Sequence, residues 1–242
     1  MPVGIIMNAA AVVLGGILGA VFGGRLTADF KAKLNMIFGA AAMTMGIVSI
    51  PLMENMPAVI FSVVIGTIIG LALHLGDRFN QAASGMQKLI SKVIKAPDSG
   101  LSEQEFTRQL VTVIVLFCAS GTGIYGSIVS GISGDHSILI AKSFLDFFTA
   151  MIFACSLGMA AAAIAVPQLV IFLILFFCAG FLYPLTTPVM IDDFKACGGL
   201  IMIATGLRIA GIKDFPIAEM IPAMLLVWPL SWAWTSWILP ML

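Results

Sequence analysis

Long apolar runs, separated by short polar segments, dominate the chain. A helix that crosses the hydrocarbon core of a bilayer needs about 20 mostly apolar residues. Runs of this kind recur along the whole sequence and predict about eight membrane-spanning helices, which favours an all-α integral membrane protein. The expected spans are Val3–Phe22, Leu34–Met53, Met56–Leu75, Leu110–Ile132, Ser137–Val166, Gln168–Thr187, Gly198–Ile212 and Ile217–Leu239.

We expect one transmembrane domain that covers residues 1–242 and has consecutive parts. Residues 1–76 hold the first three spans, and residues 77–105 form a long cytoplasmic connection. The fourth and fifth spans lie in residues 106–166, and the last three spans lie in residues 167–242.

The long connection contains an amphipathic, cationic segment, in which apolar residues recur at helical spacing with lysines between them. This pattern predicts a helix that lies on the inner leaflet of the membrane, and docking of a partner protein is the alternative. Ser102 and Glu105 have the spacing of a capping box, which would begin the next helix. The residues of the pattern are Phe79, Met86, Lys88, Leu89, Ile90, Lys92, Val93, Ile94 and Lys95.

Short segments of the first part recur in the last part at an offset of 164 or 165 residues. The offset pairs spans one, two and three with spans six, seven and eight. A shift by an odd number of spans inverts a segment across the membrane, so the pattern predicts an inverted-topology repeat. Spans four and five are a weaker candidate for a second inverted pair. The matching segments are Asp29-Phe30-Lys31 with Asp193-Phe194-Lys195, Gly46-Ile47 with Gly211-Ile212, and Glu54–Ala58 with Glu219–Ala223.

An inverted repeat has a mechanical consequence. Two similar halves of opposite orientation can exchange conformations, which gives outward-facing and inward-facing states of similar energy around a site near the bilayer midplane. The repeat therefore indicates a transporter. A duplication that was kept only for helix packing is the alternative interpretation.

Composition supports the membrane assignment, and the placement of charge adds an orientation. Apolar residues make up 60% and charged residues 10% of the chain. Soluble domains have about 45–50% apolar and about 25% charged residues, so the composition argues against a soluble enzyme or a nucleic-acid-binding protein. The net charge is zero, but nine basic residues lie in alternate connections and only Lys195 lies in the others, which puts both termini outside. The nine are Arg25, Lys31, Lys33, Arg78, Lys88, Lys92, Lys95, Arg108 and Lys213.

Motifs of common enzyme chemistries are missing from the sequence. The chain has no H-E-x-x-H, G-x-S-x-G or P-loop pattern, and its four cysteines form no C-x-x-C pair. We therefore expect no enzyme activity, no bound metal centre and no cofactor other than a coupling ion.

The fourth span combines hydroxyl side chains with three glycines within six residues, in the segment from Ser120 to Ser127. Each glycine weakens a helix by about 1 kcal/mol relative to Ala, so the segment can unwind and line a site. The hydroxyls of Ser120, Thr122 and Ser127 are then candidate ligands for a small polar solute or a cation. Close packing of helices through small residues is the alternative.

Lys142, Ser143 and Asp146 lie together in the fifth span. Lys142 and Asp146 are four residues apart, so they share one helix face and can pair. A charge near the bilayer centre costs about 3 kcal/mol on insertion scales and needs a partner or water. Asp146, which we expect to be the only carboxylate well inside a span, is the leading candidate for a proton or cation site, with Lys142 modulating its pKa and Ser143 as a polar ligand. An ion pair that only fixes helix packing is the alternative.

Two further polar residues lie in predicted spans. Arg208 in the seventh span is a candidate counter-ion for an anionic solute or a partner of Asp146, and a side chain that reaches the cytoplasmic surface is the alternative. Asn8 in the first span is expected to line the site or to bridge helices.

Several of these segments resemble those of one known family. They are Ser130–Ser137, Lys142–Asp146 and Phe153–Gly158, together with Asn8, Gly15–Gly19, Gly198–Leu200 and Gly206–Lys213. Over nearly its whole length the chain is similar to the YqgA/YdfK-like bacterial membrane proteins (domain of unknown function 554). The resemblance implies a multi-pass protein of the bacterial plasma membrane, but no activity, because the family has no assigned function.

These observations together favour a small secondary transporter that moves a small polar or anionic solute by alternating access, with Na⁺ or H⁺ as the coupling ion. A channel or passive pore is one alternative. A structural or regulatory membrane protein, recruited through the amphipathic helix, is another. The expected partners are the lipid bilayer and a small solute or ion, with no nucleic acid, and both a monomer and a homodimer remain open.

Overall fold

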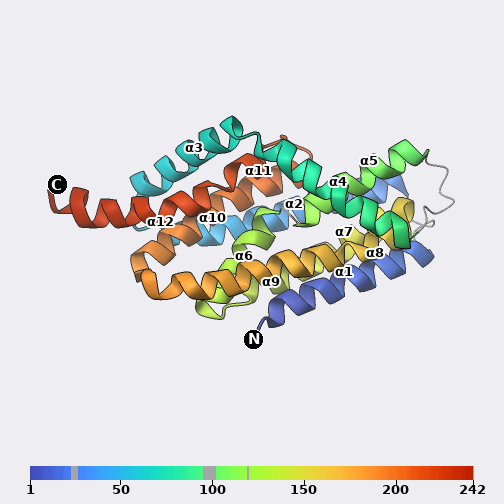
Figure 1. The fold of residues 1–242 in the computed structure, drawn as a ribbon, viewed down its shortest axis with the longest axis horizontal. Helices are drawn as coiled ribbons and strands as arrows, with labels where there is room; N and C mark the ends of the chain where they lie inside the picture. The colour runs from blue at the N-terminus through green and yellow to red at the C-terminus, as the bar shows by residue number, and fades with distance from the viewer. Residues whose placement is uncertain (23–26, 95–101, 119, 242) are drawn as a thin grey trace. The chain divides into compact units, whose positions relative to one another are not determined.

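The computed structural model describes residues 1–22, 27–94, 102–118 and 120–241. Within these ranges the chain is helical and has no strand, as the apolar pattern predicts (Figure 1). The helices are α1 (Val3–Phe22), α2 (Ala28–Ser49), α3 (Met56–Ala72), α4 (Leu75–Val93), α5 (Glu103–Cys118), α6 (Gly121–Ser133), α7 (Ser137–Leu157), α8 (Met159–Ala163), α9 (Ala165–Leu182), α10 (Pro188–Ile209), α11 (Ile217–Met220) and α12 (Ala223–Ala233), followed by the π-helical turn η4 (Trp234–Ile238); short 3₁₀ turns are η2 (Ile50–Leu52), η3 (Tyr183–Leu185) and η5 (Leu239–Met241).

Six helical stretches of the described residues are long and apolar enough to cross a membrane. A seventh is obtained if α3 and α4, which are bent by 61° at their junction, count as one span. The multi-span character is confirmed, whereas the expected count of about eight is not. The stretches are Val3–Phe22, Ala32–Leu52, Glu103–Ser133, Ser137–Leu157, Met159–Gly180 and Ile217–Met241.

The fourth and fifth predicted spans are interrupted helices. In the fourth, α5 ends at Cys118 and α6 begins at Gly121, where the Ser120 hydroxyl accepts a hydrogen bond from the Gly123 N–H at 3.2 Å. This interruption falls in the Gly-rich segment that the sequence marks as weak. The fifth is divided at Gly158, whose φ of 56° and ψ of −141° lie in a region that is essentially restricted to Gly.

Helix α10 begins ten residues earlier than the seventh predicted span, at Pro188 rather than at Gly198. Thr187 caps it by accepting a hydrogen bond from the Met190 N–H at 3.3 Å, and Pro occupies the first helical position, where no N–H is needed. The first turns of α10 therefore carry charged residues that the sequence pattern assigned to a connection.

The chain forms two compact units, each built from segments that are far apart in the sequence. Unit 1 consists of Met1–Asn35 and Arg78–Ala179, and unit 2 consists of Met36–Asp77 and Gly180–Leu242. Unit 1 thus takes α1 together with the central helices, while unit 2 combines helices from the first and last parts of the chain.

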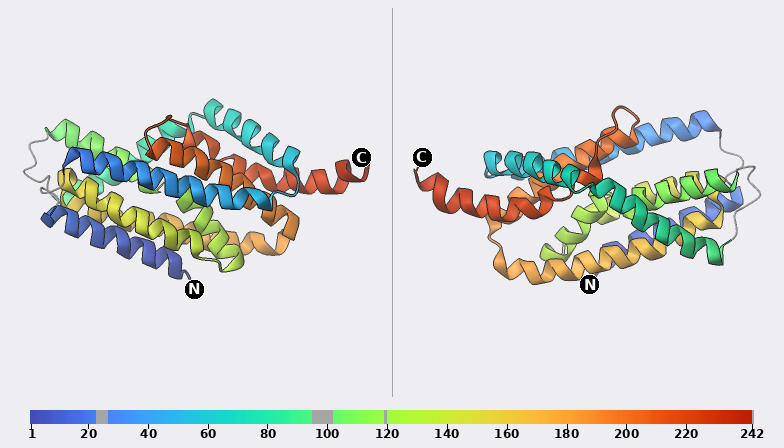
Figure 2. Two further views of the ribbon diagram at one scale, coloured as in Figure 1. Left: turned by 180° about the vertical axis from the view of Figure 1, so that it is seen from behind. Right: turned by 45° about the horizontal axis from the view of Figure 1, so that its top comes forward.

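In unit 1, α1 lies along α7 in parallel orientation (Figure 2). Gly15 of α1 faces the backbone carbonyl of Phe147, and Gly19 faces that of Met151. A Cβ atom at either glycine would overlap the facing backbone, so only Gly allows the two helices to come this close. The Gly-rich face of the first span is therefore used for packing against α7.

The core of unit 1 joins α4, α5, α7 and α8. Leu110, Phe117 and Leu157 are fully buried in it, and Ala83 and Ile90 of α4 pack against the same cluster. Helix α4 confirms the predicted amphipathic helix, but part of its apolar face packs on the protein itself. Met86 is half-buried against the same core, whereas Leu89 and Val93 are exposed. The lysine at position 95 lies outside the described residues, as does Arg25.

The start of α5 confirms the predicted capping box. The Ser102 hydroxyl donates to Glu105 Oε2 at 2.7 Å, and the Glu105 N–H donates to the same hydroxyl at 3.2 Å. The Ser102 N–H also donates to the Glu105 carboxylate at 3.0 Å, which satisfies the free donors at this helix end.

In unit 2, antiparallel helices pack in pairs through glycines. Gly46 of α2 and Gly199 of α10 face each other's carbonyl oxygens, and so do Gly39 and Gly206. Helix α3 meets α11 and α12 in the same way, with Gly66 beside Ala223. Along each pair, the residue numbers of the contacting residues rise in one helix and fall in the other, so the two helices are antiparallel.

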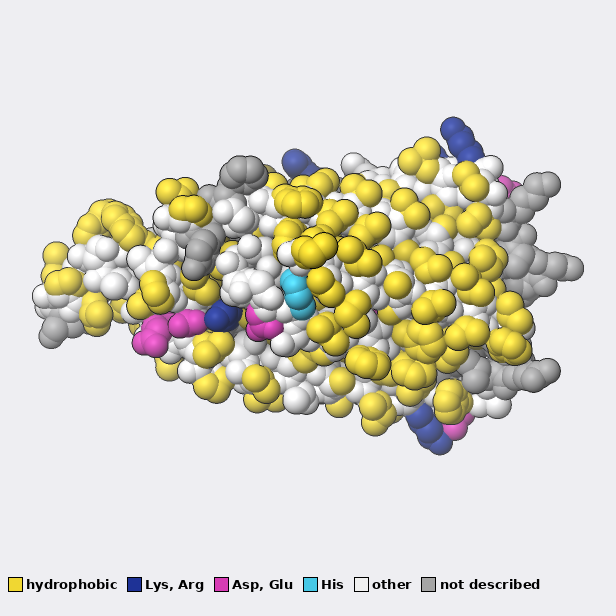
Figure 3. All heavy atoms as spheres, turned by 90° about the horizontal axis from the view of Figure 1, so that it is seen from below, with side chains coloured by type: hydrophobic (Ala, Val, Ile, Leu, Met, Phe, Trp, Pro, Cys, Tyr) yellow, Lys and Arg dark blue, Asp and Glu magenta, His cyan; other side chains and the backbone are white. Residues whose placement is uncertain are grey.

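The surface of the molecule is rich in apolar side chains. Large hydrophobic residues are exposed on α1, α3 and α9, and charged residues are sparse on the face shown in Figure 3. Soluble monomers rarely expose contiguous apolar patches of this kind, whereas a lipid-facing surface requires them. Examples are Ile6, Leu14, Val64, Ile68, Val170, Ile174 and Phe177.

Candidate functional site

A cluster of polar side chains lies inside unit 1, where α1, α7 and α9 meet. Asp146 is near the middle of α7, and its Oδ2 atom accepts hydrogen bonds from Asn8 Nδ2 at 2.9 Å and from Gln168 Nε2 at 3.0 Å. Gln168 Nε2 also donates to Asn8 Oδ1 at 2.9 Å. The three side chains therefore form a closed network that links three helices.

Lys142 completes this cluster on the same face of α7. Its Nζ atom donates to Asp146 Oδ1 at 2.8 Å, as expected for residues four apart on a helix. The ammonium group also lies 5.9 Å from the centroid of the Phe117 ring, at the distance of a cation–π contact. The structure thus brings together Asn8, Lys142 and Asp146, three of the residues that the sequence marks as candidates.

Both charges of the cluster are removed from solvent. Lys142 is 3% and Asp146 is 7% exposed, and Asn8 and Gln168 are fully buried. The ion pair makes the cluster neutral, which offsets part of the cost of desolvating two charges. The attraction between them is strong because little water screens it.

Gln168 is the member of the network that sequence reasoning missed. It lies in an apolar run, between Pro167 and Leu169. The sequence analysis used it only as the first residue of a predicted span. A lone polar side chain in the first turn of an otherwise apolar helix was the available signal. Its amide oxygen, Oε1, is buried and has no hydrogen-bond partner among the residues that the structure describes.

The hydroxyl candidates serve mainly their own helices. Ser127 donates to the Gly123 carbonyl at 2.7 Å, and Ser143 donates to the Leu139 carbonyl at 2.7 Å. Ser120 caps α6, and Thr122 is buried in the same helix. The role of all four as ligands stays a prediction, while Ser120, Ser127 and Ser143 bond to the backbone of their own helices.

Arg208 lies in unit 2, at the end of α10. Its Nε atom donates to Asp214 Oδ1 at 2.8 Å, and its side chain is 43% exposed. An exposed pair at a helix end matches the alternative in which this side chain reaches the membrane surface. Its partner in the structure is Asp214 and not Asp146, one of the candidates from the sequence.

Unit 2 has a buried carboxylate of its own, Asp193 in the first turns of α10. Helix α10 is not among the candidate membrane spans of the described residues, so the expectation that Asp146 is the only carboxylate well inside a span stays a prediction. The backbone N–H groups of Glu54 and Asn55 donate to Asp193 Oδ1 at 2.9 and 2.8 Å. Asn55 Nδ2 and the Ser231 hydroxyl donate to Oδ2 at 2.9 and 2.6 Å. The sequence interpretation missed Asp193 because it started the helix at Gly198.

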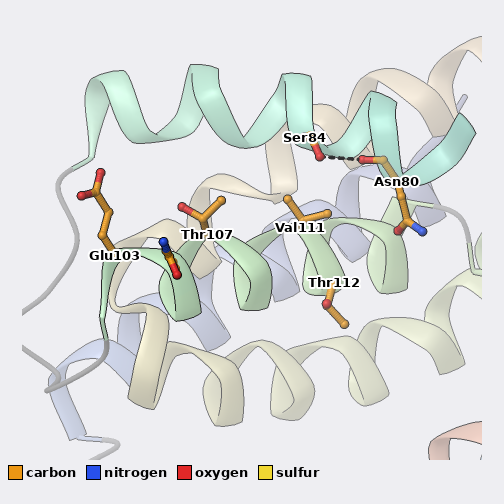
Figure 4. A pocket seen from close by; sticks show the side chains of 7 residues that line it. Asn80, Ser84, Glu103, Thr107, Val111 and Thr112 are labelled. Atoms are coloured by element: carbon orange, nitrogen blue, oxygen red, sulfur yellow. Dashed lines mark hydrogen bonds between the residues drawn. The ribbon is translucent and has the colours of Figure 1, made fainter. Parts of the chain in front are cut away.

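An open polar groove of about 550 Å³ lies between α4 and α5. Figure 4 shows Asn80 and Ser84 on α4 and Thr107 on α5 at this groove, with the Ser84 hydroxyl donating to the Asn80 carbonyl at 2.8 Å. The groove is separate from the Asp146 cluster. None of the site residues that the sequence predicted lines it. Its lining residues are Asn80, Ser84, Glu103, Gln104, Thr107, Val111 and Thr112.

Apolar helices and buried polar clusters define a multi-pass helical membrane protein, and comparisons with known proteins give its family. Residues 3–232 match the family described as "Protein of unknown function (DUF554)", and the chain belongs to this family.

Two relatives cover nearly the whole chain. It is 48% identical over 237 residues to "Uncharacterized protein YqgA" of Escherichia coli (strain K12), which covers 98% of this chain and 99% of the relative. It is 29% identical over 235 residues to "Uncharacterized membrane protein YdfK" of Bacillus subtilis (strain 168), with 92% and 93% covered. No solved structure matches the chain.

Proposed function

We propose that the protein is a small secondary transporter, which moves a small polar or anionic solute across the bacterial plasma membrane by alternating access, with Na⁺ or H⁺ as the coupling ion. The observation that carries this proposal is the buried ion pair of Lys142 and Asp146, held by Asn8 and Gln168 inside a candidate membrane span.

Packing alone is a weak reason to keep such a cluster. Each charge inside a span costs about 3 kcal/mol on insertion scales, and a buried ion pair is often no more stabilising than apolar side chains of similar volume. Ionisable groups within spans are instead typical of ion and substrate pathways. The cluster therefore supports a transport role for unit 1.

The arrangement of helices supports alternating access. The sequence repeat relates spans two and three to spans seven and eight, and in unit 2 these helices pack as the antiparallel pairs α2 with α10 and α3 with α12. Opposite orientation is what an inverted-topology repeat requires.

The orientation that we propose follows from the basic residues. Both termini lie outside, and α4, with Lys88 and Lys92, lies on the cytoplasmic side.

A search for the solute comes first in testing this proposal. Thermal-shift measurements on the purified protein, with small carboxylates and other polar metabolites, identify ligands because a ligand that binds the folded state raises its apparent stability. Each hit is then tested as a substrate for uptake into proteoliposomes, with Na⁺, H⁺ or no ion gradient.

Asp146→Asn is the decisive variant for the residue-level claim. It removes the negative charge that pairs with Lys142 and that would bind a coupling ion, so we expect uptake by the folded protein to fall by more than about tenfold. Asp192→Asn is the control, because Asp192 is partly exposed and pairs with Lys195 at 3.3 Å. A folded Asp146→Asn protein with unchanged uptake would exclude Asp146 from the transport cycle.

The alternatives predict other outcomes of the same assays. A channel or passive pore gives flux that neither saturates nor follows an ion gradient. A structural or regulatory protein gives no solute flux at all, and its effect is lost when the exposed residues of α4, such as Leu89 and Val93, are changed to polar ones.

A further inference from the structure

We propose that Asn8, Asp146 and Gln168 provide the oxygen ligands of a Na⁺ site, and that the Lys142 ammonium group takes the place of Na⁺ in the conformation described here. This inference rests on the transport function proposed above and names its coupling ion. Four observations carry it, two on the Gln168 amide and two on the pair of Lys142 and Asp146.

The first observation is the unpaired oxygen of Gln168. Its Oε1 atom is buried and has no partner among the described residues, while the Nε2 atom of the same amide donates twice. A buried acceptor without a donor has lost its hydrogen bonds to water and gained none from the protein, which is unfavourable. A cation that binds this oxygen would supply the missing partner in another conformation.

The second observation is the position of the same amide. Its nitrogen lies 2.9 Å from Asn8 Oδ1 and 3.0 Å from Asp146 Oδ2. When the amide rotates by half a turn, its oxygen and nitrogen exchange places. Three oxygens from α1, α7 and α9 then face one another, which is unfavourable without a cation and is the oxygen-rich environment that a hard cation prefers.

The third observation concerns charge. Asp146 supplies one negative charge, and Lys142 neutralises it at 2.8 Å. A second cation beside this pair would leave a net positive charge in a medium of low dielectric constant, which is costly. Na⁺ and the Lys142 ammonium group therefore compete for the same carboxylate, and occupancy by one excludes the other.

The fourth observation is the reach of Lys142. It lies on the same helix as Asp146, one turn away, and its ammonium group already contacts the Phe117 ring at 5.9 Å. A flexible side chain with this alternative contact can release the carboxylate without a change in the helix backbone. Lys142 thus acts as a tethered competitor.

Asp193 in unit 2 is a buried carboxylate that, unlike Asp146, is held by backbone as well as side-chain donors. It receives four hydrogen bonds, two of them from backbone N–H groups. Among the described residues, no buried side-chain oxygen around Asp193 lacks a hydrogen-bond partner. Of the two clusters, the one around Asp146 is therefore the one with spare ligand capacity.

The test measures the apparent melting temperature of the purified full chain in NaCl and in choline chloride of equal ionic strength. We expect Na⁺ to raise it by about 2–8 °C at saturation. Lys142→Met removes the competitor, so its Na⁺-dependent shift should be larger and half-maximal at a Na⁺ concentration at least about tenfold lower. Gln168→Leu removes a ligand and should lose the shift. Gln87→Leu is the matched control, because Gln87 is buried but bonds to Ser91 at 2.9 Å, and it should keep the shift.

Each result has a clear reading. Equal melting temperatures in NaCl and choline chloride, for both the parent and Lys142→Met, overturn the site. A full Na⁺ shift in Gln168→Leu overturns it as well, even if Lys142→Met does not fold. Because this assay needs no solute, solute uptake without a Na⁺ shift refutes only the coupling ion, and a Na⁺ shift without any uptake refutes only the transport function.

Discussion

Asp146 and Asp193 are both buried carboxylates, but their partners differ in kind. Asp193 binds two backbone N–H groups at the start of α3, so it acts as a cap for that helix from a neighbouring one. Asp146 binds only side chains, and these can rotate. The contacts of Asp193 fix the backbone at the start of α3. The side-chain contacts of Asp146 allow the cluster more than one arrangement.

This difference predicts that Asp193 matters for stability rather than for transport. Asp193→Ala leaves two backbone donors and the Ser231 hydroxyl without their acceptor, so we expect a loss of about 2–4 kcal/mol in the free energy of unfolding. Asp192→Ala, its exposed neighbour, should cost less than about 1 kcal/mol. Denaturation in detergent measures both, and equal losses would contradict the capping role.

The sequence identified Asn8, Lys142 and Asp146 because a polar side chain inside an apolar run is conspicuous. It did not identify Asp193, since the start of α10 depends on Thr187 and Pro188 rather than on hydropathy. It also could not identify Asn8 and Gln168 as partners of Asp146, because contacts between distant helices leave no mark in a single sequence. The orphan oxygen of Gln168 was beyond prediction for the same reason.

At the scale of elements, glycines decide how close helices come. Gly15 and Gly19 allow α1 to contact the backbone of α7, and Gly46 and Gly199 do the same for α2 and α10. The sequence shows these glycines, but only the structure tells which ones face another backbone. Apolar periodicity predicted most helices well, whereas it missed the division at Gly158, which depends on a backbone angle.

We therefore expect opposite effects from two Gly→Ala substitutions. Gly15→Ala places a methyl group against the Phe147 carbonyl and should destabilise the protein by about 1–3 kcal/mol or more, because backbone must move. Gly85→Ala in α4 meets no described atom within 4 Å and should stabilise by up to about 1 kcal/mol, since Ala favours helix. Thermal denaturation of both variants checks the prediction, and a stable Gly15→Ala protein would contradict the close packing of α1 on α7.

At the scale of the whole molecule, the sequence predicted a helical membrane protein with many spans, and the structure agrees. It did not predict the division into two units, because each unit joins two segments that are separated by the residues of the other unit, 36–77 in unit 1 and 78–179 in unit 2. A hydropathy pattern shows which consecutive residues form a helix. It does not show which helices pack together, and this packing defines the two units.

The proposed orientation makes a prediction about reporter fusions. A green fluorescent protein joined after Ile94 should fluoresce, because the basic residues place α4 inside. Alkaline phosphatase joined after Leu242 should be active, because the carboxyl terminus is expected outside. Fluorescence of the first reporter at both positions would contradict the orientation.

The interleaving of the two units has a consequence for synthesis. Residues 36–77 enter the membrane long before residues 180–242, the only other part of unit 2, are translated. During that interval the glycine-lined faces of α2 and α3 have no permanent partner, so lipid or an insertion factor must cover them. Packing of unit 2 is therefore completed only after α10 and α12 have been synthesised.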